Sequence, residues 1–187
     1  MNTPAHAVVN LLLLSRNGGQ ARVSAIVAGA LIPDLAIIGF YAWQLVRDTP
    51  ESVIWSVEYH QPFWQGLIDS FNSIPLILLA ILACALARRP LALAFFASML
   101  LHCLGDLPLH HDDAHRHFFP FSDWRFASPV SYWDPAHHGA LASLAEIAAV
   151  LAASAFLYWR RPPLRRWIVA LLSIYLLYWG YVLTFWM

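Results

Sequence analysis

Histidine and carboxylate side chains occur inside the apolar segments of this chain, where an ionisable group is most costly. Four of them lie within or beside hydrophobic runs: His6, Asp34, His102 and Glu146. An ionisable group in hydrocarbon is unfavourable by several kcal/mol, so such a residue usually marks a functional site. Imidazole and carboxylate groups in these positions indicate a metal centre built into a membrane protein.

The motif H-x-x-x-D, formed by His102 and Asp106, is the most compact of these patterns. On a helix this spacing puts both side chains on one face, about 6 Å apart along the axis, so that one metal ion can bind both. The alternative is a neutral histidine hydrogen-bonded to a carboxylate. Asp34 directly follows Pro33, and it is either a further ligand or a cap for backbone N–H groups freed by the proline.

Further histidines extend the set of possible ligands. His6 lies in the first turn of its helix and is either a ligand or a solvated histidine. His60 lies in the first long loop and is either a ligand or a loop histidine at the lipid interface. His138 is favoured over His137 as a ligand, because His137 points away from Glu146. Glu146 is eight residues past His138, too far along the helix to share its ion, but close enough to serve a neighbouring one.

The segment at 102–117, H-C-L-G-D-L-P-L-H-H-D-D-A-H-R-H, holds more acid–base groups than one mononuclear site can use. Catalytic roles are predicted for four consecutive residues, His110, His111, Asp112 and Asp113. His115 and His117, in the same loop, are either functional or solvated. A histidine-rich external loop can also bind metals loosely without catalysis.

The chemistry of the donors narrows the choice of metal. Imidazole with carboxylate and without thiolate suits Zn²⁺ best, with Mn²⁺ and Fe²⁺ as alternatives. The predicted metal ligands are His6, Asp34, His60, His102, Asp106, His138 and Glu146. Such a set could hold roughly one to three ions, which activate water and stabilise the charge on a phosphoryl oxygen.

Membrane-spanning helices must position these residues. The 187-residue chain is 60% hydrophobic and 12% charged, whereas soluble domains carry about 25% charged residues. Its formal net charge is zero, which gives no indication of a nucleic-acid partner. Helices are predicted at 4–15, 21–46, 72–88, 91–107, 137–159 and 166–186. The sequence therefore predicts one all-α domain over 1–187, a polytopic transmembrane helical bundle with about five spans plus a short N-terminal helix.

The arginines predict the orientation of this bundle. Eight of the eleven arginines fall on one side of the predicted spans. By the positive-inside rule this side is cytoplasmic, and the long loops at 47–71 and 108–136 are external. His6, Asp34, His102 and Glu146 then lie about 15 to 21 Å above the cytoplasmic arginines, at similar depths.

An ordered set of motifs runs from His6 through G-A-L-I-P-D, which ends at Asp34, to His60, H-x-x-x-D and P-F-S-D-W-R-F at 120–126. This set resembles the bacterial inner-membrane metal-dependent hydrolases of the YdjM-like family. The resemblance implies a hydrolase with metal ligands at His6, Asp34, His60, His102 and Asp106. A looser likeness reaches zinc-dependent phospholipase C, although this chain has His138 and Glu146 where that family has H-x-x-x-E.

Together these patterns predict a metallohydrolase of the bacterial inner membrane whose site faces the outer leaflet. The expected partners are the lipid bilayer and a phosphoester in a lipid or lipid-linked substrate. One alternative is a redox protein in which His6 and His102 ligate b-type haem. Another is a non-catalytic metal-binding or transport protein.

Overall fold

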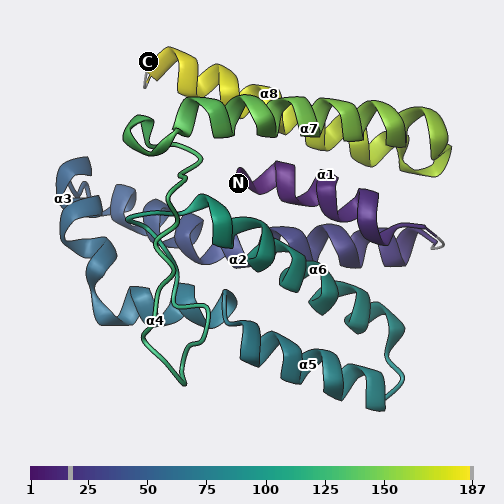
Figure 1. Ribbon diagram of the computed structural model, residues 1–187, viewed down its shortest axis with the longest axis horizontal. Helices are drawn as coiled ribbons and strands as arrows, with labels where there is room; N and C mark the ends of the chain where they lie inside the picture. The colour runs from purple at the N-terminus through teal and green to yellow at the C-terminus, as the bar shows by residue number, and fades with distance from the viewer. Residues whose placement is uncertain (17–18, 186–187) are drawn as a thin grey trace.

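The computed structural model describes residues 1–16 and 19–185, which form eight α-helices and no β-strand (Figure 1). The helices are α1 (Thr3–Leu14), α2 (Gln20–Val46), α3 (Glu51–Ser56), α4 (Pro62–Phe71), α5 (Ile74–Leu86), α6 (Pro90–Asp106), α7 (Gly139–Arg160) and α8 (Arg165–Phe185). Single 3-10 turns are η1 (Glu58–His60), η2 (Leu107–Leu109), η3 (Pro135–His137) and η4 (Pro162–Leu164). The predicted all-α fold is confirmed, and every predicted helix boundary among the described residues lies within two residues of an observed one. The predicted end of the last helix, at 186, lies outside the described residues.

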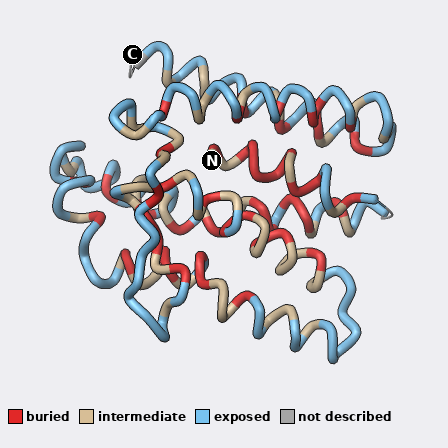
Figure 2. The backbone as a smooth tube through the Cα atoms, viewed as in Figure 1, coloured by how far each residue is buried: buried red, intermediate tan, exposed pale blue. Residues whose placement is uncertain are grey.

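The short helix α1 lies at the centre of the bundle. It runs between the α7–α8 hairpin and the α2–α6 pair, and it contacts all four helices (Figure 1). Most of its length is buried (Figure 2). A helix that is apolar all round is stable only when neighbours cover every side, which explains why α1 packs inside the bundle.

Small and polar side chains hold α1, α2 and α6 together. A Cβ atom at Gly29 of α2 would lie 2.1 Å from the Phe95 carbonyl oxygen of α6, so only glycine permits this approach. The Ser98 hydroxyl of α6 donates to the Ile26 carbonyl of α2 over 2.6 Å. Asn10 of α1 donates to the Ser98 carbonyl over 2.8 Å. These contacts fix the relative positions of the helices that carry His6, Asp34 and His102.

The segment at 47–71 was predicted as a loop, but it contains α3, η1 and α4. Pro62 at the first position of α4 has a backbone angle suited to a helix start. Ile54 of α3 and Ile68 of α4 are buried with Phe40 of α2 in a second small core. Burial of these apolar residues outweighs the polar composition that favoured a loop.

Four segments are long and apolar enough to cross a membrane: Gln20–Val46, Pro90–Leu109, Gly139–Arg160 and Pro162–Thr184. The helices α4 and α5 meet at a bend of 41° and give a fifth if they are counted as one broken span. Large apolar side chains cover the outer faces, among them Leu79, Leu144 and Leu177. An apolar exterior of this extent is suited to contact with lipid.

The connections segregate to the two ends of the bundle. The C-terminal ends of α1, α5 and α7 lie at one end, and the 47–73 and 107–138 segments lie at the other (Figure 1). From the end of α6 the 107–138 segment passes α4 and then returns to α7 (Figure 1). It therefore covers the ends of the helices that carry the polar residues.

Candidate metal centre

His6, His102 and Asp106 form the core of a buried polar cluster. Their ligand atoms all lie within 4.8 Å of one another, an arrangement that could hold a metal ion. His6 Nε2 lies 2.9 Å from Asp106 Oδ1, and His102 Nε2 lies 3.0 Å from Asp106 Oδ2. The α-amino nitrogen of Met1 also lies 2.6 Å from Asp106 Oδ1. One carboxylate of α6 thus joins two histidines from different helices.

Helix α2 orients His102 and adds a second carboxylate. The Nδ1 atom of His102 donates to the Ala30 carbonyl over 2.8 Å, which directs Nε2 into the cluster. This Nε2 lies 3.4 Å from Asp34 Oδ1. A backbone carbonyl that fixes the tautomer of a histidine is typical of the surroundings of a metal ligand.

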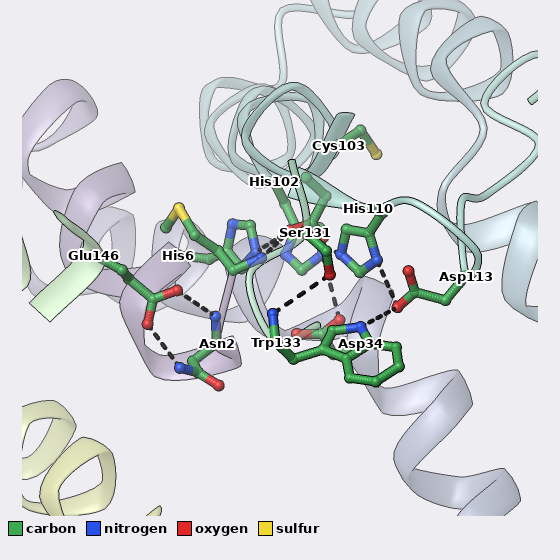
Figure 3. Close-up of polar contacts among 12 residues, drawn as sticks. Asn2, His6, Asp34, His102, Cys103, His110, Asp113, Ser131, Trp133 and Glu146 are labelled. Atoms are coloured by element: carbon green, nitrogen blue, oxygen red, sulfur yellow. Dashed lines mark hydrogen bonds and ion pairs between the residues drawn. The ribbon is translucent and has the colours of Figure 1, made fainter. Parts of the chain in front are cut away.

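His110 links the cluster to the segment that covers it (Figure 3). Its Nε2 lies 3.5 Å from Asp106 Oδ1, and its Nδ1 lies 2.9 Å from Asp113 Oδ2. Asp113 also accepts a hydrogen bond from the Trp133 indole over 3.1 Å. Burial lowers the pKa of His110, but the two carboxylates outweigh it and raise this pKa to about 9. His110 therefore holds a proton beside Asp106.

Several buried polar atoms of this cluster have no well-aligned hydrogen bond. These atoms are Asp34 Oδ2, His102 Nε2, Asp113 Oδ1 and both ring nitrogens of His110. Buried polar atoms nearly always find a partner, and an unpaired one costs roughly 1–3 kcal/mol. Their concentration at one place fits a cation or ordered water bound among them. The donors, imidazole and carboxylate, are those that Zn²⁺ takes.

Contacts with α7 and α6 hold the start of α1 beside the polar cluster. The Glu146 carboxylate of α7 accepts from the Asn2 backbone N–H over 2.9 Å and from the Asn2 side-chain amide over 2.7 Å. Glu146 also accepts from the Tyr175 hydroxyl of α8 over 3.0 Å. Gly105 of α6 lies beside the His6 ring, since a Cβ atom at Gly105 would be in van der Waals contact with His6 Cε1, at 3.4 Å. The α7–α8 hairpin thus holds the start of α1.

A buried ion pair holds the covering segment to α4. Asp69 is almost fully buried, and it accepts from the Arg116 backbone N–H over 3.0 Å and from its Nε over 2.5 Å. Arg125 donates to Gln65 Oε1 over 2.8 Å and to the Ala114 carbonyl. Asp123 accepts from the other side of Arg116 over 2.7 Å. The P-F-S-D-W-R-F motif therefore helps to hold this segment in place.

Two further histidines lie in the covering segment. His115 and His117 are both buried, and His117 Nδ1 donates to the Asn72 carbonyl over 3.1 Å. Burial and the neighbouring His110 lower the pKa of His115 to about 4. Burial also lowers the pKa of His117. Both side chains are almost fully buried, which excludes the solvated alternative for either residue.

The structure brings together four of the predicted metal ligands: His6, Asp34, His102 and Asp106. It adds His110, which was predicted to be catalytic. The other three predicted ligands lie elsewhere. His60 is exposed, with its ring against Tyr59. His138 is exposed because its left-handed backbone, with φ of 63°, begins α7 there.

Glu146 was predicted as a metal ligand, but it lies to one side of the cluster, where its carboxylate binds Asn2 (Figure 3). Its other contact is with Tyr175, and it is buried in the bundle. The roles of Asn2 and Asp69 were missed. The signal for Asp69 was an acidic residue in the apolar run at 62–71, which resembles the signal that identified Asp34.

Comparison of the chain with models of protein families, with curated proteins and with solved structures gives no match.

Proposed function

We propose that this protein is a membrane-embedded, metal-dependent hydrolase that cleaves a phosphoester of a lipid or lipid-linked substrate. The observation that carries the proposal is the buried group of His6, His102 and Asp106, surrounded by polar atoms without hydrogen bonds. The resemblance to the YdjM-like family and the looser likeness to zinc-dependent phospholipase C support the same reaction class.

In this proposal His6, His102 and Asp106 hold the ion, and Asp34 is close enough to His102 to join them. The ion, Zn²⁺ or alternatively Mn²⁺ or Fe²⁺, would lower the pKa of water and stabilise phosphoryl charge when bound. His110 has the position of a proton donor to the leaving alcohol, because its ring lies between Asp106 and Asp113. The covering segment would exclude bulk water.

The stacking of two histidines argues against b-type haem. Haem ligation needs one imidazole on each side of a porphyrin, with both Nε2 atoms directed at the iron. The rings of His6 and His102 instead lie face to face with their centroids 3.7 Å apart. A porphyrin cannot fit between these two rings, whereas the ligand atoms of His6, His102 and Asp106 are close enough together to hold one small ion.

The charge distribution supports an orientation with the site towards the outer side of the bacterial inner membrane. The C-terminal ends of α1, α5 and α7 lie at the end of the bundle that is rich in arginine. The polar cluster lies instead near the end of α6, below the 107–138 segment. The positive-inside rule makes the arginine-rich end cytoplasmic, and a lipid phosphoester would then come from the outer leaflet.

The activity is tested with the full-length protein in detergent or nanodiscs, stripped of metal with a chelator and reloaded with Zn²⁺ or Mn²⁺. The substrates are p-nitrophenyl phosphorylcholine and a short-chain phosphatidylcholine. We expect hydrolysis that depends on added metal and is lost in His102→Ala and Asp106→Ala. The matched control is His60→Ala, which removes an exposed histidine and should keep full activity.

Two results would overturn the proposal. Hydrolysis that persists in both variants would place the chemistry elsewhere. Tight metal binding that His102→Ala abolishes, without hydrolysis of any phosphoester, would favour the non-catalytic or transport alternative.

The orientation is tested separately by labelling in intact cells with a membrane-impermeant maleimide. Ser56→Cys and Ser122→Cys introduce exposed thiols in the two long segments, in a Cys84→Ala background. Both should react before the membrane is opened. Reaction only after permeabilisation would reverse the proposed topology.

A further inference from the structure

Four aromatic side chains form an exposed patch at the tip of the covering segment. Phe121 is 71% exposed and Trp124 is 51% exposed, and Phe118 and Phe126 are also exposed. The centroid of the Trp124 ring lies 5.7 Å from that of Phe118 and 6.1 Å from that of Phe126. An exposed apolar patch of this kind marks a surface that binds a protein or a membrane.

Two hydrogen bonds place this aromatic patch at the level where α5 begins. The backbone N–H of Ile74, the first residue of α5, donates to the His117 carbonyl over 2.9 Å. The hydroxyl of Ser73, the N-cap of α5, donates to the Phe119 carbonyl. Helix α5 is apolar along its whole length, so its start marks where the hydrocarbon ends and the polar interface of a bilayer begins.

The aromatic patch also lies at the edge of the bundle, where lipid can reach it from the side. Helix α5 packs mainly against α6, and Leu79 and Leu82 on its other faces are more than half exposed. The tip of the covering segment projects beyond α4 on the side of the bundle where α5 lies (Figure 1). Every residue from 120 to 127 is exposed (Figure 2). The patch therefore continues the lipid-facing surface of α5.

Charged residues at the tip limit how deeply the aromatic patch can enter a bilayer. The Asp123 side chain, next to Trp124, is 89% exposed, and its carboxylate lies 2.7 Å from Arg116 Nη1. An exposed carboxylate is unfavourable in hydrocarbon, whereas Trp and Phe are typical of segments that lie in the membrane–water interface. The charges of Asp123 and Arg116 also cancel, so the rings and not a net charge would hold the tip to lipid.

We propose that the aromatic patch anchors the covering segment in the lipid interface beside α5. The rings lie at the upper ends of the acyl chains, and Ser122 and Asp123 face the headgroups and water. The partner is the bilayer itself, and a zwitterionic bilayer is sufficient because the contact is apolar. The segment that reaches the polar cluster through His110 is thereby held by lipid as well as by α4. This inference goes beyond the hydrolase proposal, and it depends neither on that proposal nor on the orientation of the bundle.

The test attaches the environment-sensitive fluorophore NBD to full-length Phe121→Cys in a Cys84→Ala background. Phe121 is the most exposed ring of the patch, so this substitution should leave the fold intact. The protein is placed in phosphatidylcholine nanodiscs that contain lipid with a doxyl quencher near the headgroup end of the acyl chain. We expect emission at a shorter wavelength than in water, and strong quenching by the doxyl lipid. The control site is Ser56→Cys on α3, which lies farther out than the tip and should give emission as in water (Figure 1).

A second variant tests whether the rings act together. With the fluorophore kept at Phe121→Cys, Trp124→Ser should reduce the quenching, whereas Trp43→Ser, which removes an equally exposed tryptophan of α2, should leave it unchanged. Equal quenching in these two variants would overturn the patch as the anchor. Emission as in water from the unsubstituted patch would also overturn it. Short-wavelength emission that the doxyl lipid does not quench would assign the patch to a protein contact, such as a second copy of this chain, and would overturn the lipid anchor.

Discussion

His6 and His102 stack face to face with their ring centroids 3.7 Å apart, and each directs Nε2 to a different oxygen of the Asp106 carboxylate. Their helices, α1 and α6, are far apart in the sequence, and both pack against α2. Two like charges at this distance would repel each other, so the stack favours at least one neutral ring with a lone pair available to a cation. The predictions below test how the surrounding residues maintain this arrangement.

The two carboxylates of the cluster should contribute unequally to metal binding. Asp106 lies within 3.0 Å of two ring nitrogens, whereas Asp34 lies 3.4 Å from one. Loss of a group that only orients a ligand reduces metal affinity by roughly 10–100-fold, and Asp34→Asn should reduce Zn²⁺ affinity by about this factor. Asp106→Asn should reduce Zn²⁺ affinity by more. Competition with a chromophoric chelator measures both. Equal, unchanged affinities would show that neither carboxylate binds the ion.

Gly29→Ala should destabilise the bundle, because its Cβ atom would lie 2.1 Å from the Phe95 carbonyl oxygen. Overpacking of this kind costs about 1–3 kcal/mol and would push α2 away from α6. Gly39→Ala in the same helix is the matched control, since nothing lies within 4 Å of its Cβ position. Thermal unfolding in detergent should show a lower melting temperature for Gly29→Ala alone. Equal melting temperatures would contradict the close helix contact.

Glu146→Gln should weaken metal binding although Glu146 does not contact the cluster. A glutamine has one acceptor oxygen in place of two, and its NH₂ group would face a donor of Asn2 or Tyr175. The start of α1 would then shift, and His6 with it. Tyr175→Phe removes one of the three hydrogen bonds and should have a smaller effect. The protein should stay folded by circular dichroism, and unchanged Zn²⁺ affinity in Glu146→Gln would show that Glu146 serves packing only.

Asp69→Asn should release the segment that covers the cluster. Asp69 is 1% exposed and Arg116 is 19% exposed, so loss of this charged hydrogen bond should cost roughly 1.5–3 kcal/mol. Asp123, the other partner of Arg116, is 89% exposed. Asp123→Asn should therefore lower the free energy of unfolding by only about 0–1 kcal/mol. Amide hydrogen exchange over 107–138 should rise strongly in Asp69→Asn and little in Asp123→Asn. Equal exchange in the two variants would argue against this anchor.

The free energy of unfolding of the metal-free protein should decrease both below and above about pH 6.5, the pKa of an unperturbed histidine. The pKa of buried His115, which faces His110, His117, Asp106 and Asp69, is lowered to about 4. Below pH 6.5 the unfolded chain binds a proton that the folded protein does not, so stability falls by up to about 3 kcal/mol as the pH decreases to 4. The pKa of His110 is raised to about 9, so its contribution is lost as the pH rises towards 9.

Melting temperatures measured from pH 4 to 9 check this profile. His115→Gln should flatten the acidic side and leave the alkaline side, because only His115 changes. An acidic side of unchanged slope in this variant would assign the effect to His117 or to the carboxylates.

The helices could be predicted from the sequence because apolar runs of nearly membrane length leave few alternatives, and because prolines and arginines mark their ends. The convergence of His6, Asp34, His102 and Asp106 was also predictable, since their depth follows from helix rise alone. The depth of a residue does not, however, specify on which side of the helix its side chain projects. The Glu146 carboxylate is directed to Asn2 and not to the metal cluster, and it accepts from the backbone N–H and the side-chain amide of Asn2.

The covering segment could not be predicted in the same way. Its path depends on the ion pair between Arg116 and Asp69, which are far apart in the sequence. The left-handed backbone of His138 turns that residue outward and leaves His137 against His111. No periodicity reports such contacts, so the sequence could not predict which of the two histidines packs against His111.

The short length of α5 has a consequence for the bilayer around the bundle. Its 13 residues span about 20 Å, whereas the hydrocarbon core of a bilayer is about 30 Å thick. Helix α4 extends the apolar belt only at an angle of 41°. In a bilayer of that thickness, lipid on this side would meet a hydrophobic mismatch, which local thinning of the bilayer would relieve. Headgroups of the thinned leaflet would then sit deeper beside α4 and α5 than beside the α7–α8 hairpin.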